Sequence, residues 1–236
     1  MINFLHYTAI FLELLTAILG IVVYRRTTPG MRPIIRYVQF GSILQLLVVY
    51  YRTFTLPENP IRRTLAHWSV ACGQWFPFQV QYNNLPLFHI TGFMEDFFLF
   101  LFFRQIFTSP KLSRVVFFAY VGIVITDILL LCTSEPLLVY NSIQKILTTA
   151  YIFVFGILYY YEVYSRAEVS SLMSHWQYWM VGVLMLHGAG TFFQDLAGNL
   201  FLFSDKIQLD IFVFGSVLWI IFYLTIITIL WKTKRG

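Results

Sequence analysis

Of the ionisable residues within apolar stretches of the sequence, eight histidines and acids stand out, because their chemistry would be unusual there. They comprise three histidines and five acidic residues: His6, Glu13, His89, Glu95, Asp96, Asp127, His187 and Asp195. An ionisable side chain inside a membrane helix is costly, and it normally faces the bundle interior, a partner or water. We therefore take these eight residues as candidate ligand-binding residues. For any one of them, a purely structural hydrogen bond or a position near the headgroups is the alternative.

The spacing of these residues places imidazoles and carboxylates on shared helix faces. Residues seven or eight apart lie about two turns from each other on one side of a helix. Three helices repeat this pattern: His6 with Glu13, His89 with Asp96, and His187 with Asp195. A polar pocket lined by several helices, with aromatic walls, is the arrangement that this pattern predicts.

Metal binding is a second chemistry open to these groups, because neutral imidazoles and carboxylates suit zinc or iron. The candidate ligands are His89, Asp96, His187 and Asp195. The sequence has no HExxH, HxxxH, ExxH or CxxC motif, so the ligands would have to come together from separate helices. His89 and His187 could also be considered as the two axial ligands of a haem. Their predicted depths in the membrane differ, which fits a common haem plane poorly. We assign no cofactor.

The composition explains why these residues must sit in a membrane. Of 236 residues, 58% are hydrophobic and only 11% are charged, whereas soluble proteins carry about a quarter charged residues. The apolar residues form blocks of about twenty, the length that spans a bilayer core as a helix. We predict one all-α domain over residues 1–236, a bundle of seven transmembrane helices at about 2–24, 34–54, 85–107, 114–133, 142–164, 176–198 and 207–231.

Basic residues set the predicted orientation. With the N-terminus outside, eleven of the 16 Lys and Arg residues fall on the cytoplasmic side and five outside, as the positive-inside rule requires. The first apolar block is followed by Arg25 and Arg26, and the chain ends in the basic segment 232–235. Because the basic residues lie between apolar blocks and form no basic face, we expect no nucleic-acid partner.

The loop at residues 55–84 is predicted to be external and to contain a short interfacial helix, either a connector or a lid over the pocket. Cys72 in this loop and Cys132 at the end of the fourth helix are expected on the same side of the membrane. A disulfide between them and two separate packing cysteines both remain open.

The seven-helix plan with an exported N-terminus resembles rhodopsins and heptahelical receptors in topology only. A retinal protein needs a Schiff-base lysine in the middle of its seventh helix. Here that helix has none, because Lys206 and Lys232 lie at or beyond its ends. We therefore exclude a retinal Schiff base.

The orientation places most of the candidate residues in the outer half of the bundle. This predicts a receptor-like sensor in a cell membrane, most simply a bacterial inner membrane, that binds a small molecule, lipid or ion in an outward-opening pocket. Its output would require a cytoplasmic protein partner or a homo-oligomer. A metal-dependent membrane hydrolase acting on a lipid, and a proton or ion pathway, are the alternatives.

Overall fold

The computed structural model describes residues 2–53, 85–133, 142–166, 175–200 and 205–235. Within these ranges every regular element is helical and no strand occurs, which confirms the predicted all-α class. The predicted interfacial helix in residues 55–84 and the side chains of Cys72 and Cys132 lie outside the described part of the chain.

Seven α-helices and two short 3-10 turns make up the described chain. The helices are α1 (Ile2–Val23), α2 (Arg32–Thr53), α4 (Leu85–Ile106), α5 (Pro110–Thr133), α6 (Ser142–Arg166), α8 (Trp176–Leu200) and α9 (Asp205–Arg235), and the turns are η1 (Tyr24–Arg26) and η2 (Pro29–Met31). Helix α5 begins four residues before the predicted start, because Pro110 fits the first helical position, where no amide hydrogen is needed. Helix α9 extends past its predicted end at 231, through the basic segment to Arg235.

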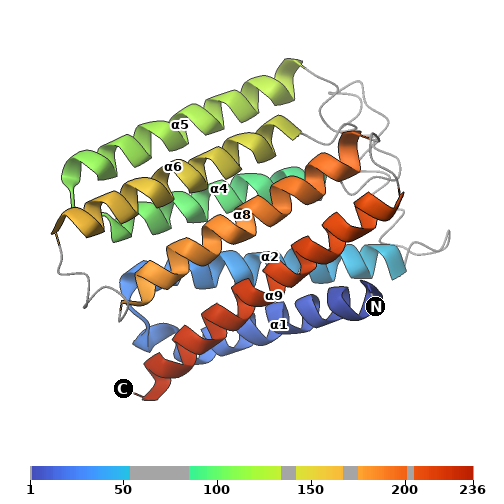
Figure 1. Ribbon diagram of the computed structural model, residues 1–236, viewed down its shortest axis with the longest axis horizontal. Helices are drawn as coiled ribbons and strands as arrows, with labels where there is room; N and C mark the ends of the chain where they lie inside the picture. Colours follow the sequence, from blue (N-terminus) through green and yellow to red (C-terminus); the bar gives the residue numbers. More distant parts are fainter. Residues whose placement is uncertain (1, 54–84, 134–141, 167–174, 201–204, 236) are drawn as a thin grey trace.

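Six of the helices form a closed ring. Helix α1 packs against α2 and α9, α4 packs against α2 and α6, and α8 packs against α6 and α9. Helix α5 lies outside this ring, against α4 and α6. Figure 1 shows the helices running roughly side by side, with the two termini of the chain at opposite ends of the bundle.

The outer surface is apolar. Of the helices that the structure describes, four are long and apolar enough to cross a membrane: Tyr7–Arg26, Pro110–Leu130, Ile143–Ser165 and Leu209–Lys232. Large apolar side chains are exposed on all seven helices, among them Phe4, Ile43, Phe97, Phe118, Ile157, Phe193 and Phe214. A surface of this kind is stable against lipid and not against water. These features indicate a multi-pass membrane protein.

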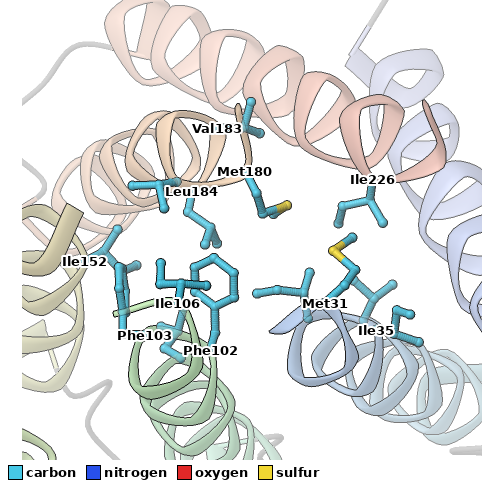
Figure 2. Close-up of a cluster of buried hydrophobic side chains, with 14 of the residues drawn as sticks. Met31, Ile35, Phe102, Phe103, Ile106, Ile152, Met180, Val183, Leu184 and Ile226 are labelled. Atoms are coloured by element: carbon cyan, nitrogen blue, oxygen red, sulfur yellow. The ribbon is translucent and has the colours of Figure 1, made fainter. Parts of the chain in front are cut away.

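The buried interior is apolar at one end of the bundle and more polar toward the other. At the end that holds the C-terminus, fully buried apolar side chains fill the ring (Figure 2), including Met31, Ile35, Phe102, Phe103, Met180, Leu184 and Ile226. Toward the end that holds the N-terminus, buried polar residues replace them. On three helices the polar residue lies nearer this end than the core residue does: Ser42 against Ile35 on α2, Glu95 against Phe102 on α4, and His187 against Met180 on α8.

Candidate functional site

The ring interior contains an ion pair between α4 and α6. The Nζ atom of Lys145 lies 2.9 Å from Oε2 of Glu95, and the Glu95 side chain is 9% exposed. The hydroxyl of Tyr37, on α2, also hydrogen-bonds to the Glu95 carboxylate. His187, on α8, interacts electrostatically with both members of the pair. One carboxylate thus connects four helices of the ring.

His187 is held by aromatic side chains. Its ring centroid lies 4.5 Å from that of Phe222 and 5.6 Å from that of Trp219, both on α9. The Trp219 Nε1 atom is buried and has no hydrogen-bond partner. An apolar wall beside a few polar groups is the usual composition of a small-molecule site.

The small residues around His187 allow close helix packing. A Cβ on Gly188 would lie 3.3 Å from Ile152 of α6, and a Cβ on Gly190 would lie 2.7 Å from Leu218 of α9. Residues 187–190 of α8 therefore approach both neighbouring helices closely. Their small side chains serve this packing, as small residues often do in membrane bundles.

Glu13 brings the two remaining helices of the ring into the same polar interior. Its carboxylate accepts hydrogen bonds from Ser42 of α2, at 3.4 Å, and from the hydroxyl of Tyr223 of α9. Tyr37 and Tyr223 each interact electrostatically with both Glu13 and Glu95. The two tyrosines therefore connect the two carboxylates.

We call this set the ring network. Each of the six ring helices supplies at least one of its members: Glu13 (α1), Tyr37 and Ser42 (α2), Glu95 (α4), Lys145 (α6), His187 (α8) and Tyr223 (α9).

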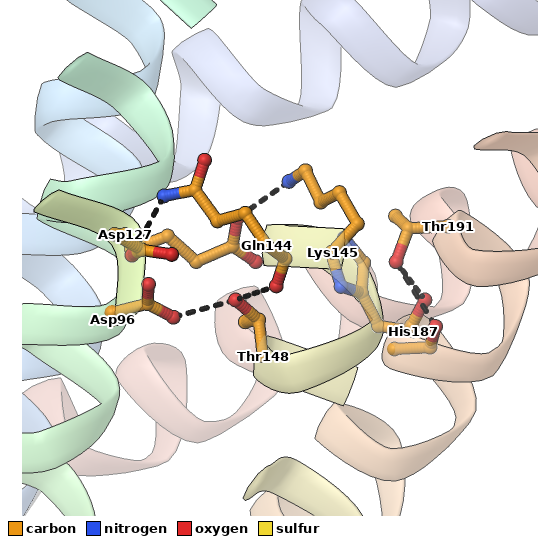
Figure 3. A network of polar contacts seen from close by, with 9 residues as sticks. Asp96, Asp127, Gln144, Lys145, Thr148, His187 and Thr191 are labelled. Carbon is orange, nitrogen blue, oxygen red and sulfur yellow. Dashed lines mark hydrogen bonds and ion pairs between the residues drawn. The ribbon is translucent and has the colours of Figure 1, made fainter. Parts of the chain in front are cut away.

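A second set of polar contacts lies where α4, α5 and α6 meet. The Thr148 hydroxyl, on α6, donates to Oδ1 of Asp96 on α4 at 2.6 Å. The Gln144 amide, one turn earlier on α6, donates to Oδ2 of Asp127 on α5 at 3.1 Å. Figure 3 shows both carboxylates beside these two α6 side chains. We call these four residues the three-helix network.

The structure divides the candidate residues that were predicted to line one pocket. Glu13, Glu95 and His187 belong to the ring network, whereas Asp96 and Asp127 belong to the three-helix network. The division arises because consecutive residues on a helix point about 100° apart. The side chains of His6, His89 and Asp195 lie outside the described residues.

The four candidate metal ligands are likewise not brought together in the part of the molecule that can be described. His89 and Asp195 are undescribed, and Asp96 and His187 fall in different networks. Among the described side chains, no group of three or more His, Cys, Asp or Glu residues is arranged to hold a metal ion.

Several polar residues of these networks were not among the candidates. They are Tyr37, Ser42, Gln144, Lys145, Thr148 and Tyr223. Most are neutral, and neutral polar residues are too common in membrane helices to stand out. Lys145 was not a candidate because it lies near the start of its helix, although it pairs with Glu95. The i, i+4 spacing of Gln144 and Thr148 was the available signal that they share a face.

Two other acidic residues have simpler roles. Glu162 accepts hydrogen bonds from the Thr108 amide and hydroxyl and from the Ser109 amide at 2.8 Å, so it fixes the connection between α4 and α5 to α6. Asp210 on α9 is exposed. Neither residue belongs to the ring network or the three-helix network.

Comparison of the chain with protein-family models, with curated proteins and with solved structures gave no match.

Proposed function

We propose that the chain is a seven-helix membrane sensor, receptor-like in plan, that binds a small polar or zwitterionic molecule in the ring interior. The ligand enters from the outside, where the N-terminus lies, and the response passes to the cytoplasmic end. The membrane is a cell membrane, most simply a bacterial inner membrane. The receiver is a cytoplasmic protein partner or a second copy of the chain.

The observation that carries this proposal is the convergence of all six ring helices on the ring network. Separated charges are costly in a membrane interior unless they are paired or solvated. A ligand that competes for Glu95 or Lys145 must therefore change hydrogen bonds on several helices at once. Such a differential contact is what a binding event needs in order to shift a helix bundle between two states.

The chemistry of the network favours a ligand that carries both charges or an ammonium group. Lys145 and Glu95 offer opposite charges 2.9 Å apart. Glu13 offers a further carboxylate whose described hydrogen-bond donors, Ser42 and Tyr223, are neutral hydroxyls. The rings of Phe222 and Trp219 beside His187 supply the apolar wall. This combination suits a compact zwitterion or a lipid headgroup.

Two features support the proposed topology. The two termini lie at opposite ends of the bundle, as an odd number of spans requires (Figure 1). The basic residues Arg25, Arg26, Arg104, Lys111 and Lys232 fall near helix ends on the side of the C-terminus. The excess of positive charge at this end favours the cytoplasm.

The test is a ligand screen on the purified protein in lipid nanodiscs. A panel of amino acids, amines, carboxylates and soluble lipid headgroups is scanned for a rise in the thermal melting midpoint, because a ligand that binds the folded state stabilises it. We expect at least one zwitterion or amine to stabilise the wild type and to lose most of this effect in Glu95→Gln. Stabilisation that is unchanged in Glu95→Gln and in Glu13→Gln would contradict the proposed site.

A further inference from the structure

We propose that Asp96 and Asp127 hold a monovalent alkali cation, of which sodium is the physiological representative, at the junction of α4, α5 and α6. This site is separate from the ring network, and the proposal does not depend on which ligand the ring network binds.

The two carboxylates are fixed by neighbouring turns of a single helix. Thr148 donates to Oδ1 of Asp96 at 2.6 Å, and Gln144 donates to Oδ2 of Asp127 at 3.1 Å. The Thr148 hydroxyl also lies 3.0 Å from the carbonyl oxygen of Gln144, which fixes its rotamer. The position of each carboxylate is thus set by α6, although the acids themselves come from α4 and α5.

One oxygen of each carboxylate remains without a hydrogen-bond partner. These are Oδ2 of Asp96 and Oδ1 of Asp127, on side chains that are only 2% and 1% exposed. An unpaired carboxylate oxygen buried at this depth is costly. The two acids also interact electrostatically with each other. A cation bound by these oxygens would offset both costs.

The hydroxyl of Tyr151 is a third, independent indication of a ligand. Tyr151 follows Thr148 by one turn on α6, its hydroxyl is buried without a hydrogen-bond partner, and the residue is 5% exposed. It interacts electrostatically with Asp96. The Tyr151 hydroxyl therefore adds a neutral oxygen on the Asp96 side of the junction, and hard oxygen ligands are those that alkali and alkaline-earth cations prefer over nitrogen or sulfur.

The negative charges of Asp96 and Asp127 are not neutralised by their described hydrogen-bond donors. The hydrogen-bond donors to the two acids, Thr148 and Gln144, are both neutral. Lys145 acts on Asp96 electrostatically, but its ammonium makes its ion pair with Glu95 at 2.9 Å. A bound cation lowers the cost of keeping two negative charges away from water.

The number of oxygens favours a monovalent ion. Calcium takes six to eight oxygen ligands, and magnesium usually keeps several of its waters. The described side chains here offer two free carboxylate oxygens together with the oxygens of Tyr151, Thr148 and Gln144. This is a small set in a tightly packed place, where Gly92 of α4 leaves just enough space for the Gln144 side chain.

The test is equilibrium binding of radioactive sodium to the full-length protein in nanodiscs. We expect one saturable site per chain, which unlabelled sodium displaces and choline does not. Asp96→Asn and Asp127→Asn each keep an oxygen that accepts the bond from α6 but remove the charge, so each is expected to weaken sodium binding at least tenfold. Asp210→Asn removes an exposed carboxylate of α9 and serves as the matched control, with unchanged binding.

Several results would overturn the proposal: no saturable sodium binding by folded wild-type protein, binding unchanged in both amide variants, or displacement of sodium by calcium at far lower concentration than by sodium itself. If the amide variants do not fold, two other measurements take their place. Sodium is expected to raise the melting midpoint of the wild type relative to choline at equal ionic strength, and Tyr151→Phe, which removes one oxygen, is expected to weaken sodium binding severalfold. Failure of both would also overturn it.

Discussion

Glu95 and Asp96 are consecutive residues of α4, yet their carboxylates belong to different networks. Glu95 pairs with Lys145 and Tyr37 in the ring interior, whereas Asp96 accepts its hydrogen bond from Thr148 at the junction with α5. One turn of helix thus supplies both networks, because the two side chains diverge by about 100°. Helices α4 and α6 therefore contribute side chains to both networks, and Glu95 and Lys145 of the ring network also act electrostatically on Asp96.

The Glu95–Lys145 pair is expected to behave as a coupled unit. Lys145→Met leaves a buried carboxylate without its counter-charge, and breaking a buried pair in this way costs up to about 3–5 kcal/mol. The double variant Glu95→Gln, Lys145→Met removes both charges and should recover much of that loss. Melting midpoints of the two single variants and the double variant provide the measurement. Additive losses would show that the two side chains do not interact.

Gly92 is expected to tolerate no side chain while Gln144 keeps its place. A Cβ there would lie 2.6 Å from Nε2 of Gln144, so Gly92→Ala must displace this amide from Asp127. The lost hydrogen bond to a buried acceptor costs about 1–3 kcal/mol.

Two comparisons make the Gly92 prediction specific. In a Gln144→Ala background the same substitution should cost little, because the side chain it displaces is gone. Gly122→Ala on α5 is the matched control, since nothing lies within 4 Å of its added Cβ, and it should be neutral or stabilising by about 0.5–1 kcal/mol. Equal losses at Gly92 with and without Gln144 would contradict the explanation.

Glu162 is expected to matter for stability and not for binding. Its carboxylate accepts hydrogen bonds from the backbone amides of Thr108 and Ser109 and from the Thr108 hydroxyl. Glu162→Ala removes these acceptors and should lower the free energy of unfolding by about 1–3 kcal/mol. Thermal melting measures the loss, and ligand or sodium affinity of the folded fraction should stay unchanged. A change in affinity without a change in stability would argue for a direct role in binding.

The proposed topology makes a separate prediction. A green fluorescent protein fused after Arg235 should fold and fluoresce, because the C-terminus is proposed to be cytoplasmic. Alkaline phosphatase fused within 134–141 should be active, because this connection is proposed to lie outside. A dark C-terminal fusion together with inactive phosphatase would reverse the orientation.

The sequence predicts the helical class and the positions of the helices well for a physical reason. Apolar blocks of about twenty residues separated by proline, glycine and basic residues have few other ways to satisfy their backbone in a membrane. Pro110 shows the limit, since α5 begins at this proline, four residues before the predicted start of the helix at 114. Such boundary details depend on local packing more than on composition.

The candidate site is predicted only in part. Burial of Glu13, Glu95, Asp96, Asp127 and His187 follows from the cost of charge in lipid, and all five are buried. Their division into two networks does not follow, because it depends on how α4 is rotated toward α5 and α6. The pairing of Lys145 with Glu95 was also missed, since 50 residues separate them and no sequence spacing relates them.

The central claim, that the ring network faces an opening to the outside, is tested most directly by thiol accessibility. The background is Cys72→Ser with Cys132→Ser, which removes both native thiols. Ser42→Cys then places a small thiol beside Glu13, and Ile34→Cys, on the same helix α2, places one in the apolar core of the bundle. We expect a membrane-impermeant thiol reagent added outside intact cells to modify the first and spare the second. Asn141→Cys, in the connection proposed to lie outside, is the positive control for the reagent. If Asn141→Cys is modified and neither Ser42→Cys nor Ile34→Cys is, the result contradicts an outward-opening site.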